Sequence, residues 1–181
     1  MAFLPACAPA AVSLASCPDG SAGVSNIYYC QKSDISAVTV TSGDITGFTM
    51  TTGSIFYEIQ TDDQVSTFVE ESADVRYASK INQTLTATIP GLSSAIQQQL
   101  LSIKNCCELV VVVKLNSGVY KVMGYDVDYA ADTATYKNCQ VNVLGWDSKA
   151  TQDDDYAGFN LGTSCTTTGL SPIFTGTLTL S

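Results

Sequence analysis

The chain of 181 residues contains no histidine, and this absence removes several kinds of chemistry at once. Neither a Ser-His-Asp or Cys-His nucleophile nor a histidine-ligated zinc site can be built without it. Phosphate- and dinucleotide-binding glycine motifs and CxxC pairs are also missing. The sequence therefore predicts a protein that is not an enzyme and that has no cofactor and no metal.

Charged residues are scarce, and most of them are acidic. They make up 14% of the chain, against about 25% in a typical soluble domain, and 8 basic residues face 17 acidic ones for a net charge of −9. Arg76 is the one arginine. Because proteins that bind nucleic acid neutralise phosphates with lysine and arginine, we do not expect tight binding to DNA or RNA. Serine and threonine are abundant, and we expect other copies of the chain to cover part of this hydroxyl-rich, charge-poor surface.

Long apolar runs are also absent, since none reaches the roughly 18 residues of a membrane span. The sequence LASC, at residues 14–17, matches the signal by which bacterial lipoproteins are acylated at cysteine. However, no basic residue precedes Lys32, and Pro5 and Pro9 interrupt the stretch that a secretory signal keeps apolar. We therefore interpret residues 1–25 as an extended, uncleaved arm. The alternative is an exported lipoprotein that serves as a fimbrial or adhesin subunit.

The seven cysteines do not resemble a disulfide framework. Their number is odd, two of them are adjacent, and a chain of this length can form a core without disulfides. We expect most of them to be small buried thiols in a protein assembled in a reducing cytosol. A bridge among Cys7, Cys17 and Cys30 remains an alternative.

From residue 26 onward the pattern is that of one β-rich domain, spanning 26–181. Aromatic and β-branched residues recur in short runs, and residues 51–53 suggest a hairpin turn between two of them. In residues 81–90, Leu85 and its alternate neighbours are apolar while the residues between are threonines, as in a half-buried strand. Residues 108–115 are apolar on both faces, which indicates a central strand. Further strands are expected at 26–30, 37–43, 47–50, 54–60, 119–129, 139–145 and 172–180.

One helix is expected after residue 92. Ser93 or Ser94 can cap it, and it ends near Asn105. Ile96, Leu100 and Ile103 form its apolar stripe at the spacing of one helix face, and three glutamines face largely outward. The fold class predicted by the sequence is therefore mainly β: an antiparallel β-sandwich or barrel-like domain with one flanking α-helix.

Acidic clusters are the remaining candidates for sites. Asp126, Asp128 and Asp132 have the spacing of calcium-loop positions one, three and seven, but Ala131 and Lys137 stand where such a loop needs glycine and glutamate. We expect a solvated strand end there instead. The run of three aspartates at 153–155 is likewise interpreted as a solvated loop. A carbohydrate-binding β-sandwich would need exposed aromatic residues, for which one tryptophan and scattered tyrosines give little support.

Residues 62–80 are a polar, acidic segment between two strands. They form either a solvated hairpin arm or loop, or an arm that reaches a neighbouring subunit; a stretch so polar is not expected to pack on its own core. The acidic residues proposed to line a lumen or to lie in this arm are Glu58, Asp62, Asp63, Glu70, Glu71 and Asp74.

The order of these features from about residue 23 to residue 146 resembles the tail tube proteins of bacteriophages, in particular those of Bacteroidetes-type hosts. The resemblance rests on IYYCQKSDI, GDITGFTM with SIFYEIQ, the acidic TFVEES, QTLTATIP, the helix SSAIQQQLLSIKN, and ELVVVVKLNSGVYKVMGYD. It implies a structural virion protein, assembled in the host cytoplasm, whose copies form stacked, hexameric rings.

In such a tube the sheets of neighbouring subunits join into an inner barrel, other virion tail proteins bind its ends, and DNA crosses the lumen as a passenger that is not bound. The cysteine-rich N-terminus and the segment after residue 146 depart from the family. A ring-forming connector or a capsid-associated phage protein is therefore the alternative.

Overall fold

The structure is a computed structural model that describes residues 23–61, 66–73, 80–90, 93–106, 108–147, 150–151, 154–155 and 158–180. It confirms a mainly β fold with one α-helix. The elements are β1 (Val24–Gln31), η1 (Lys32–Asp34), β2 (Ile35–Thr41), β3 (Asp44–Met50), β4 (Tyr57–Gln60), β5 (Thr67–Ser72), β6 (Ile81–Pro90), α1 (Ser94–Lys104), β7 (Leu109–Leu115), β8 (Tyr120–Met123), β9 (Tyr125–Asp128), β10 (Thr133–Tyr136), β11 (Cys139–Asp147), β12 (Ala150–Thr151), β13 (Asp154–Asp155), β14 (Gly158–Thr167) and β15 (Ile173–Phe174).

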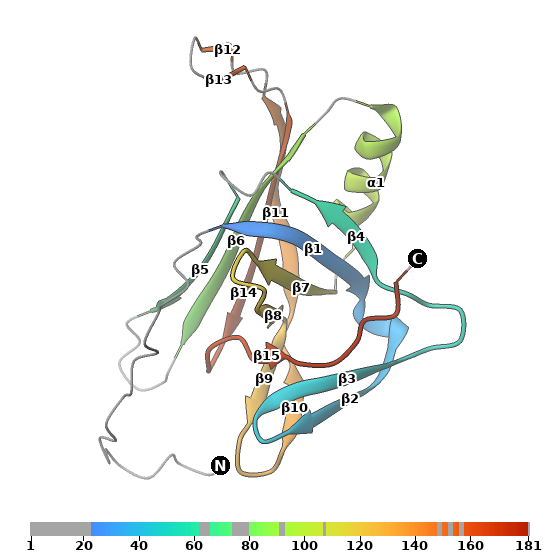
Figure 1. The fold of residues 1–181 in the computed structure, drawn as a ribbon, viewed down its shortest axis with the longest axis vertical. Helices are drawn as coiled ribbons and strands as arrows, with labels where there is room; N and C mark the ends of the chain where they lie inside the picture. The colour runs from blue at the N-terminus through green and yellow to red at the C-terminus, as the bar shows by residue number, and fades with distance from the viewer. Residues whose placement is uncertain are drawn as a thin grey trace.

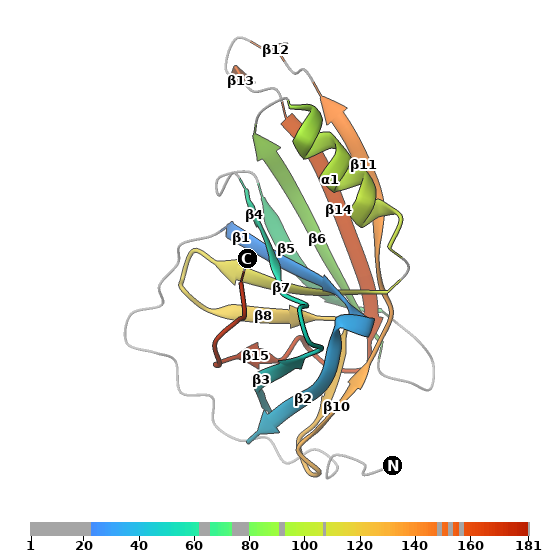
Figure 2. The ribbon, with the colours of Figure 1, turned by 90° about the vertical axis from the view of Figure 1, so that its right-hand side faces the viewer.

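Most strands belong to one strongly bent sheet (Figures 1 and 2). Its order is β2-β3-β15-β8-β7-β11-β14-β6-β5, and β1 pairs with both β7 and β4. All pairings in this sheet are antiparallel except the single bridge between β15 and β3. The bend lies where β11 parts from β7, because these two strands share only the pair Cys139 and Leu109. Beyond that point β11, β14, β6 and β5 continue as a four-stranded sheet.

The central strand β7 separates two hydrophobic cores, as its apolar residues on both faces predict. Val111 and Val113 point into the first core, which the four-stranded sheet and α1 enclose. Val110 and Val112 point into the second, which β2, β3, β15 and the β9–β10 ribbon enclose. Burial on both faces explains why this strand contains no polar residue before Lys114.

Helix α1 lies across the core face of β6, β14 and β11 (Figure 2). Of the two serines predicted as its cap, Ser93 is the one used, since its hydroxyl oxygen accepts a hydrogen bond from the backbone N–H of Ile96 at 3.2 Å. Leu100 and Ile103 are buried, and the helix ends at Lys104. None of the helices in the described ranges is long and apolar enough to span a bilayer.

The hairpin predicted at residues 51–53 is wrong. β3 pairs with β2 and not with β4, while β4 pairs with β1. The actual hairpin turn lies at Ser42 and Gly43, both of which have positive φ. A two-residue turn of this kind matches the twist of its strands better than the longer linker at 51–53. That linker leads instead to Phe56, still in the second core, and then to β4, where Ile59 packs against the first core.

A second difference concerns the single strand expected at 119–129. Gly124, with φ +93°, breaks it into β8 and β9, and β9 pairs with β10 as a separate ribbon. A side chain at this position would meet the Leu109 carbonyl oxygen at 3.2 Å. The tip of the ribbon packs on the β2–β3 turn. There the ring of Tyr129 covers Gly43, and Asp132 Oδ1 accepts a hydrogen bond from the backbone N–H of Gly43 at 3.2 Å.

Part of the polar segment 62–80 belongs to the fold. Residues 67–72 form β5, which pairs along its whole length with β6 of the same chain. The expectation that this segment would not pack on its own core is therefore wrong for β5, because Phe68 lies against the first core. The residues of β5 alternate between the two faces of the sheet, but its acidic residues obscure this pattern in the sequence.

Candidate assembly surface

The four-stranded sheet β11-β14-β6-β5 has two edges on which no other described strand pairs. β5 bonds to β6 alone. β11 leaves β7 after Cys139, so its residues 140–147 have β14 as their one described strand neighbour. Near the start of this edge the Lys104 ammonium group donates to the Val141 carbonyl at 2.8 Å. Open edges present unpaired N–H and C=O groups and are sites at which another chain can add.

One face of this sheet packs on the first core, and the other face is polar. The latter, called here the polar face, carries side chains of hydroxyl and amide type in cross-strand rows. Its members are Thr67, Val69, Glu71, Asn82, Thr84, Thr86, Thr88, Asn160, Ser164, Thr166, Gln140 and Val143. Hydrogen bonds link neighbouring strands across it, for example from the Thr166 hydroxyl to Asn82 Oδ1 at 3.2 Å. Among these twelve residues Glu71 alone is charged.

Two apolar residues interrupt the polar face, and each lies on one of its edge strands. Val69 of β5 is 42% exposed and Val143 of β11 is 53% exposed. Val69 belongs to the row of Thr84, Ser164 and Gln140, and Val143 to the adjacent row. Exposed valines at both open edges of an otherwise polar sheet are suited to contact one another between two copies of the chain.

Glu70, one of the proposed lumen or arm residues, is engaged inside this chain. Its side chain is 13% exposed and lies on the core side of β5. One oxygen accepts a short hydrogen bond from the backbone N–H of Ser171, and the other lies 3.5 Å from the ammonium group of Lys121. Lys121 in turn donates to the Ser171 carbonyl at 3.0 Å. Glu70 thus joins the edge strand to β8 and to the C-terminal segment.

The remaining proposed acidic residues lie in different places. Glu71 is exposed on the polar face. Glu58 lies on β4, away from that face, where it accepts from Asn26 Nδ2 at 2.6 Å and from the Tyr28 hydroxyl at 3.4 Å. Desolvation by burial, followed by the charge of Glu58, raises the pKa of Tyr28 to about 12. Asp62, Asp63 and Asp74 fall outside the described residues.

The three aspartates with partial calcium-loop spacing serve separate turns. Asp126 accepts from the N–H and hydroxyl of Thr168 and lies 3.6 Å from the Lys137 ammonium group. Asp128 accepts from the N–H of Ala130 at 2.9 Å, and Asp132 accepts from the β2–β3 turn. Within the described ranges no three His, Cys, Asp or Glu residues are arranged to hold a metal ion. The aspartates at 154 and 155 are placed in β13 by their backbone.

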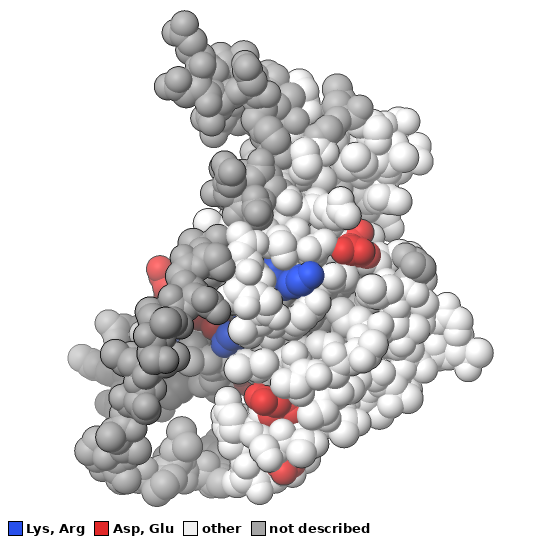
Figure 3. Space-filling model, in the orientation of Figure 1, with Lys and Arg blue, Asp and Glu red and all other residues white. Residues whose placement is uncertain are grey.

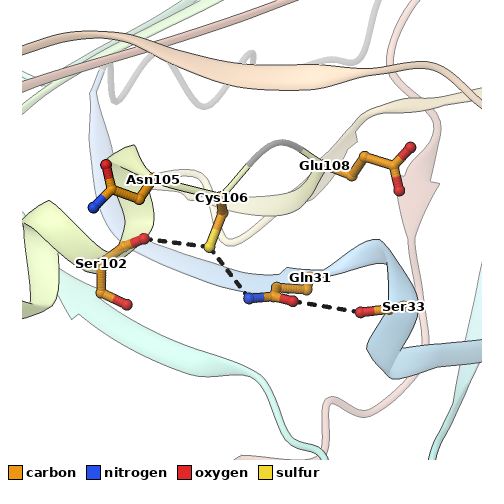
Figure 4. A pocket seen from close by; sticks show the side chains of 6 residues that line it. All are labelled: Gln31, Ser33, Ser102, Asn105, Cys106 and Glu108. Carbon is orange, nitrogen blue, oxygen red and sulfur yellow. Dashed lines mark hydrogen bonds between the residues drawn. The ribbon is translucent and has the colours of Figure 1, made fainter.

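A pocket of about 490 Å³ lies between the end of α1 and the start of η1. Its lining is polar: Gln31, Ser33, Ser102, Asn105, Cys106 and Glu108 (Figure 4). The Cys106 thiol donates to the Ser102 carbonyl at 3.3 Å and accepts from Gln31 Nε2 at 3.3 Å. Since a carbonyl and an amide cannot take the thiol proton, this arrangement does not activate a nucleophile.

The described surface is poor in charge in the view of Figure 3, where a few acidic and basic groups stand among uncharged side chains. The sequence predicted that acidic residues line a lumen or an arm, but it did not indicate that Glu70 and Glu71 lie on opposite faces of one strand. Sequence reasoning also did not identify the polar face, although the alternating threonines of β6 run along it. The two edge valines carry no signal in the sequence, because exposed and buried valines look alike there.

The chain matches no protein-family model, no curated protein and no solved structure.

Proposed function

We propose that the chain is a structural virion protein whose copies join head to tail into rings, which stack into a phage tail tube. The observation that carries this proposal is the four-stranded sheet with a polar face and two open edges, each marked by an exposed valine. A heterologous contact between the β5 edge of one copy and the β11 edge of the next uses both edges and leaves none open when the ring closes.

The strand directions support such a joint. Each of the four strands is antiparallel to its neighbour, so β5 and β11 run in opposite directions. Joining β11 to the β5 of the next copy therefore continues the antiparallel alternation around the ring. Val69 and Val143 lie one row apart, and the stagger that strands of a barrel require can bring them level.

The polar face would then line the lumen, because α1 and the first core cover the opposite face. For six copies, about 24 strands spaced by about 4.8 Å and tilted by about 40° give a backbone cylinder roughly 48 Å across. Side chains would narrow the opening to roughly 40 Å, which admits a DNA duplex. The hydroxyl and amide groups and the Glu71 carboxylate, which are the polar side chains named above for this face, offer no cation to phosphates, so DNA would pass without being held. Other tail proteins would bind the ends of the tube.

The test is a charge swap across the proposed joint, imaged by negative-stain electron microscopy. Val69→Lys with Val143→Lys places like charges on both edges and should abolish rings and tubes. Val69→Glu with Val143→Lys places opposite charges there and should restore them. Both positions are exposed, so the monomer should fold in each case, which circular dichroism checks.

The matched control is Thr84→Lys with Thr86→Lys on β6, which adds two charges to the same face away from the edges. This variant should still assemble. Equal assembly of the two edge variants would contradict the joint between β5 and β11. A wild-type protein that stays monomeric at high concentration, with neither rings nor tubes in the images, would contradict the tube itself, and single rings that never stack would favour the connector.

A further inference from the structure

Two cysteines lie directly opposite each other on the antiparallel strands β11 and β14. Cys139 is the register partner of Cys165, and both are free thiols. Residues opposed in this way have Cα atoms about 4.5 or 5.5 Å apart, inside the about 4.4–6.8 Å that a disulfide spans. Both side chains point to the same face of the two strands and belong to the same core cluster. The register therefore gives the backbone separation that a disulfide needs.

The surroundings of the pair fix both side chains. Cys139 is 0% exposed and Cys165 is 5% exposed, and both belong to the first core. The Cys165 thiol donates to Gln83 Oε1 at 2.8 Å, and the Gln83 amide donates to the Thr167 hydroxyl at 3.0 Å. Gln83 is itself fully buried. These hydrogen bonds hold the reduced Cys165 thiol toward Gln83 on β6, so closing the disulfide exchanges the bond to Gln83 for the S–S bond.

The other described cysteines have no such partner. Cys30 is buried in the second core, on the other side of β7, and Cys106 is half-buried beside the end of α1. Cys139 and Cys165 are therefore distinguished from them by register and not merely by burial.

We propose that Cys139 and Cys165 are an oxidisable dithiol that closes to a cross-strand disulfide when the protein meets a peroxide. The sulfur of Cys165, the more exposed of the two, attacks one peroxide oxygen, the O–O bond breaks, and the leaving hydroxide takes the thiol proton as water. The Cys139 sulfur then attacks the resulting sulfenic acid. The S–S bond forms, the S–O bond breaks, and the hydroxide leaves with the Cys139 proton as a second water.

Oxidation would lock β11 to β14 at the end of the four-stranded sheet that lies next to the bend of the fold. The thiols would stay reduced in a cytosol and close after release into an oxidising medium. This inference stands independently of the proposed function, since it requires only the folded monomer.

Peptide mapping tests it on the full chain. Folded protein is treated with hydrogen peroxide, denatured, alkylated and digested with trypsin, which cleaves after Lys137 and Lys149. The resulting peptides 138–149 and 150–181 contain Cys139 and Cys165 as their only cysteines. We expect one linked species that reduction separates, together with a rise of about 5–10 °C in the thermal midpoint of the oxidised protein.

The Cys30→Ala protein should give the same linked species, whereas Cys165→Ala should give none and leave Cys139 open to alkylation after denaturation. The wild-type map decides the question even where Cys165→Ala fails to fold. Two separate, alkylated peptides after treatment with excess peroxide would overturn the proposal. So would a linked species with a lower thermal midpoint than the reduced protein, because the pair would then be strained.

Discussion

Glu70 and Glu71 are adjacent in sequence but lie on opposite faces of β5. Replacing each with alanine therefore compares a carboxylate that stabilises the fold with one that is exposed on the surface. In Glu70→Ala the backbone N–H of Ser171 loses its carboxylate partner, and Lys121 loses its ion pair at 3.5 Å. A hydrogen bond to a charged group contributes about 1.5–3 kcal/mol, and an ion pair at this longer distance adds about 0.5 kcal/mol. We expect the free energy of unfolding to fall by about 2–3 kcal/mol.

For a chain of this size such a loss lowers the thermal midpoint by roughly 5–10 °C. Urea unfolding followed by far-ultraviolet circular dichroism gives the free energy directly, at protein concentrations where the chain is monomeric. Glu70→Gln keeps an oxygen that can accept from Ser171 but removes the charge, so it should lose about half as much. The loss should depend only weakly on salt, because the Glu70 side chain is mostly buried.

Glu71→Ala is the matched control, since Glu71 is exposed on the polar face, and its effect should stay within about 0.5 kcal/mol. Equal unfolding midpoints for Glu70→Ala and Glu71→Ala would refute the reasoning. It would mean that β5 is not held to β8 and the C-terminal segment by this side chain.

Three further predictions concern local features of the fold. Gly43→Ala would place a methyl group 2.1 Å from the ring of Tyr129 at a φ of +86°, and should lower the free energy of unfolding in urea by about 2 kcal/mol or more. Gly53→Ala, with φ +84° and no atom within 4 Å, should lower it by only about 1 kcal/mol. Ser93→Ala removes the cap of α1 and should lower the free energy of unfolding by about 1 kcal/mol in the same assay, with little change in circular dichroism. Burial raises the pKa of Tyr28 to about 12 from 10.0, so the unfolded chain ionises first and stability should fall as pH rises from 10 to 12; a Tyr28→Phe protein should lose less over this window, measured by urea midpoints at each pH.

The sequence determined those elements that depend on local contacts and on a regular pattern of buried residues. The stripe of α1 and its serine cap depend on contacts within one helical turn and on one apolar face, so spacing alone located them. The alternation of β6 and the unbroken apolar run of β7 likewise record which faces are buried. Composition also restricted the chemistry, because the lack of histidine is independent of any fold.

Only the tertiary structure decided which strand pairs with which. Turn residues near 51–53 look like a hairpin, yet β3 pairs with β2 and β4 with β1, since partner choice depends on packing between residues far apart in the chain. The same holds for the opposite roles of Glu70 and Glu71 and for the pairing of Cys139 with Cys165, 26 positions apart in the sequence. A pattern along the chain records how buried a residue is, whereas its neighbours across the sheet are set by register, which no local window of sequence contains.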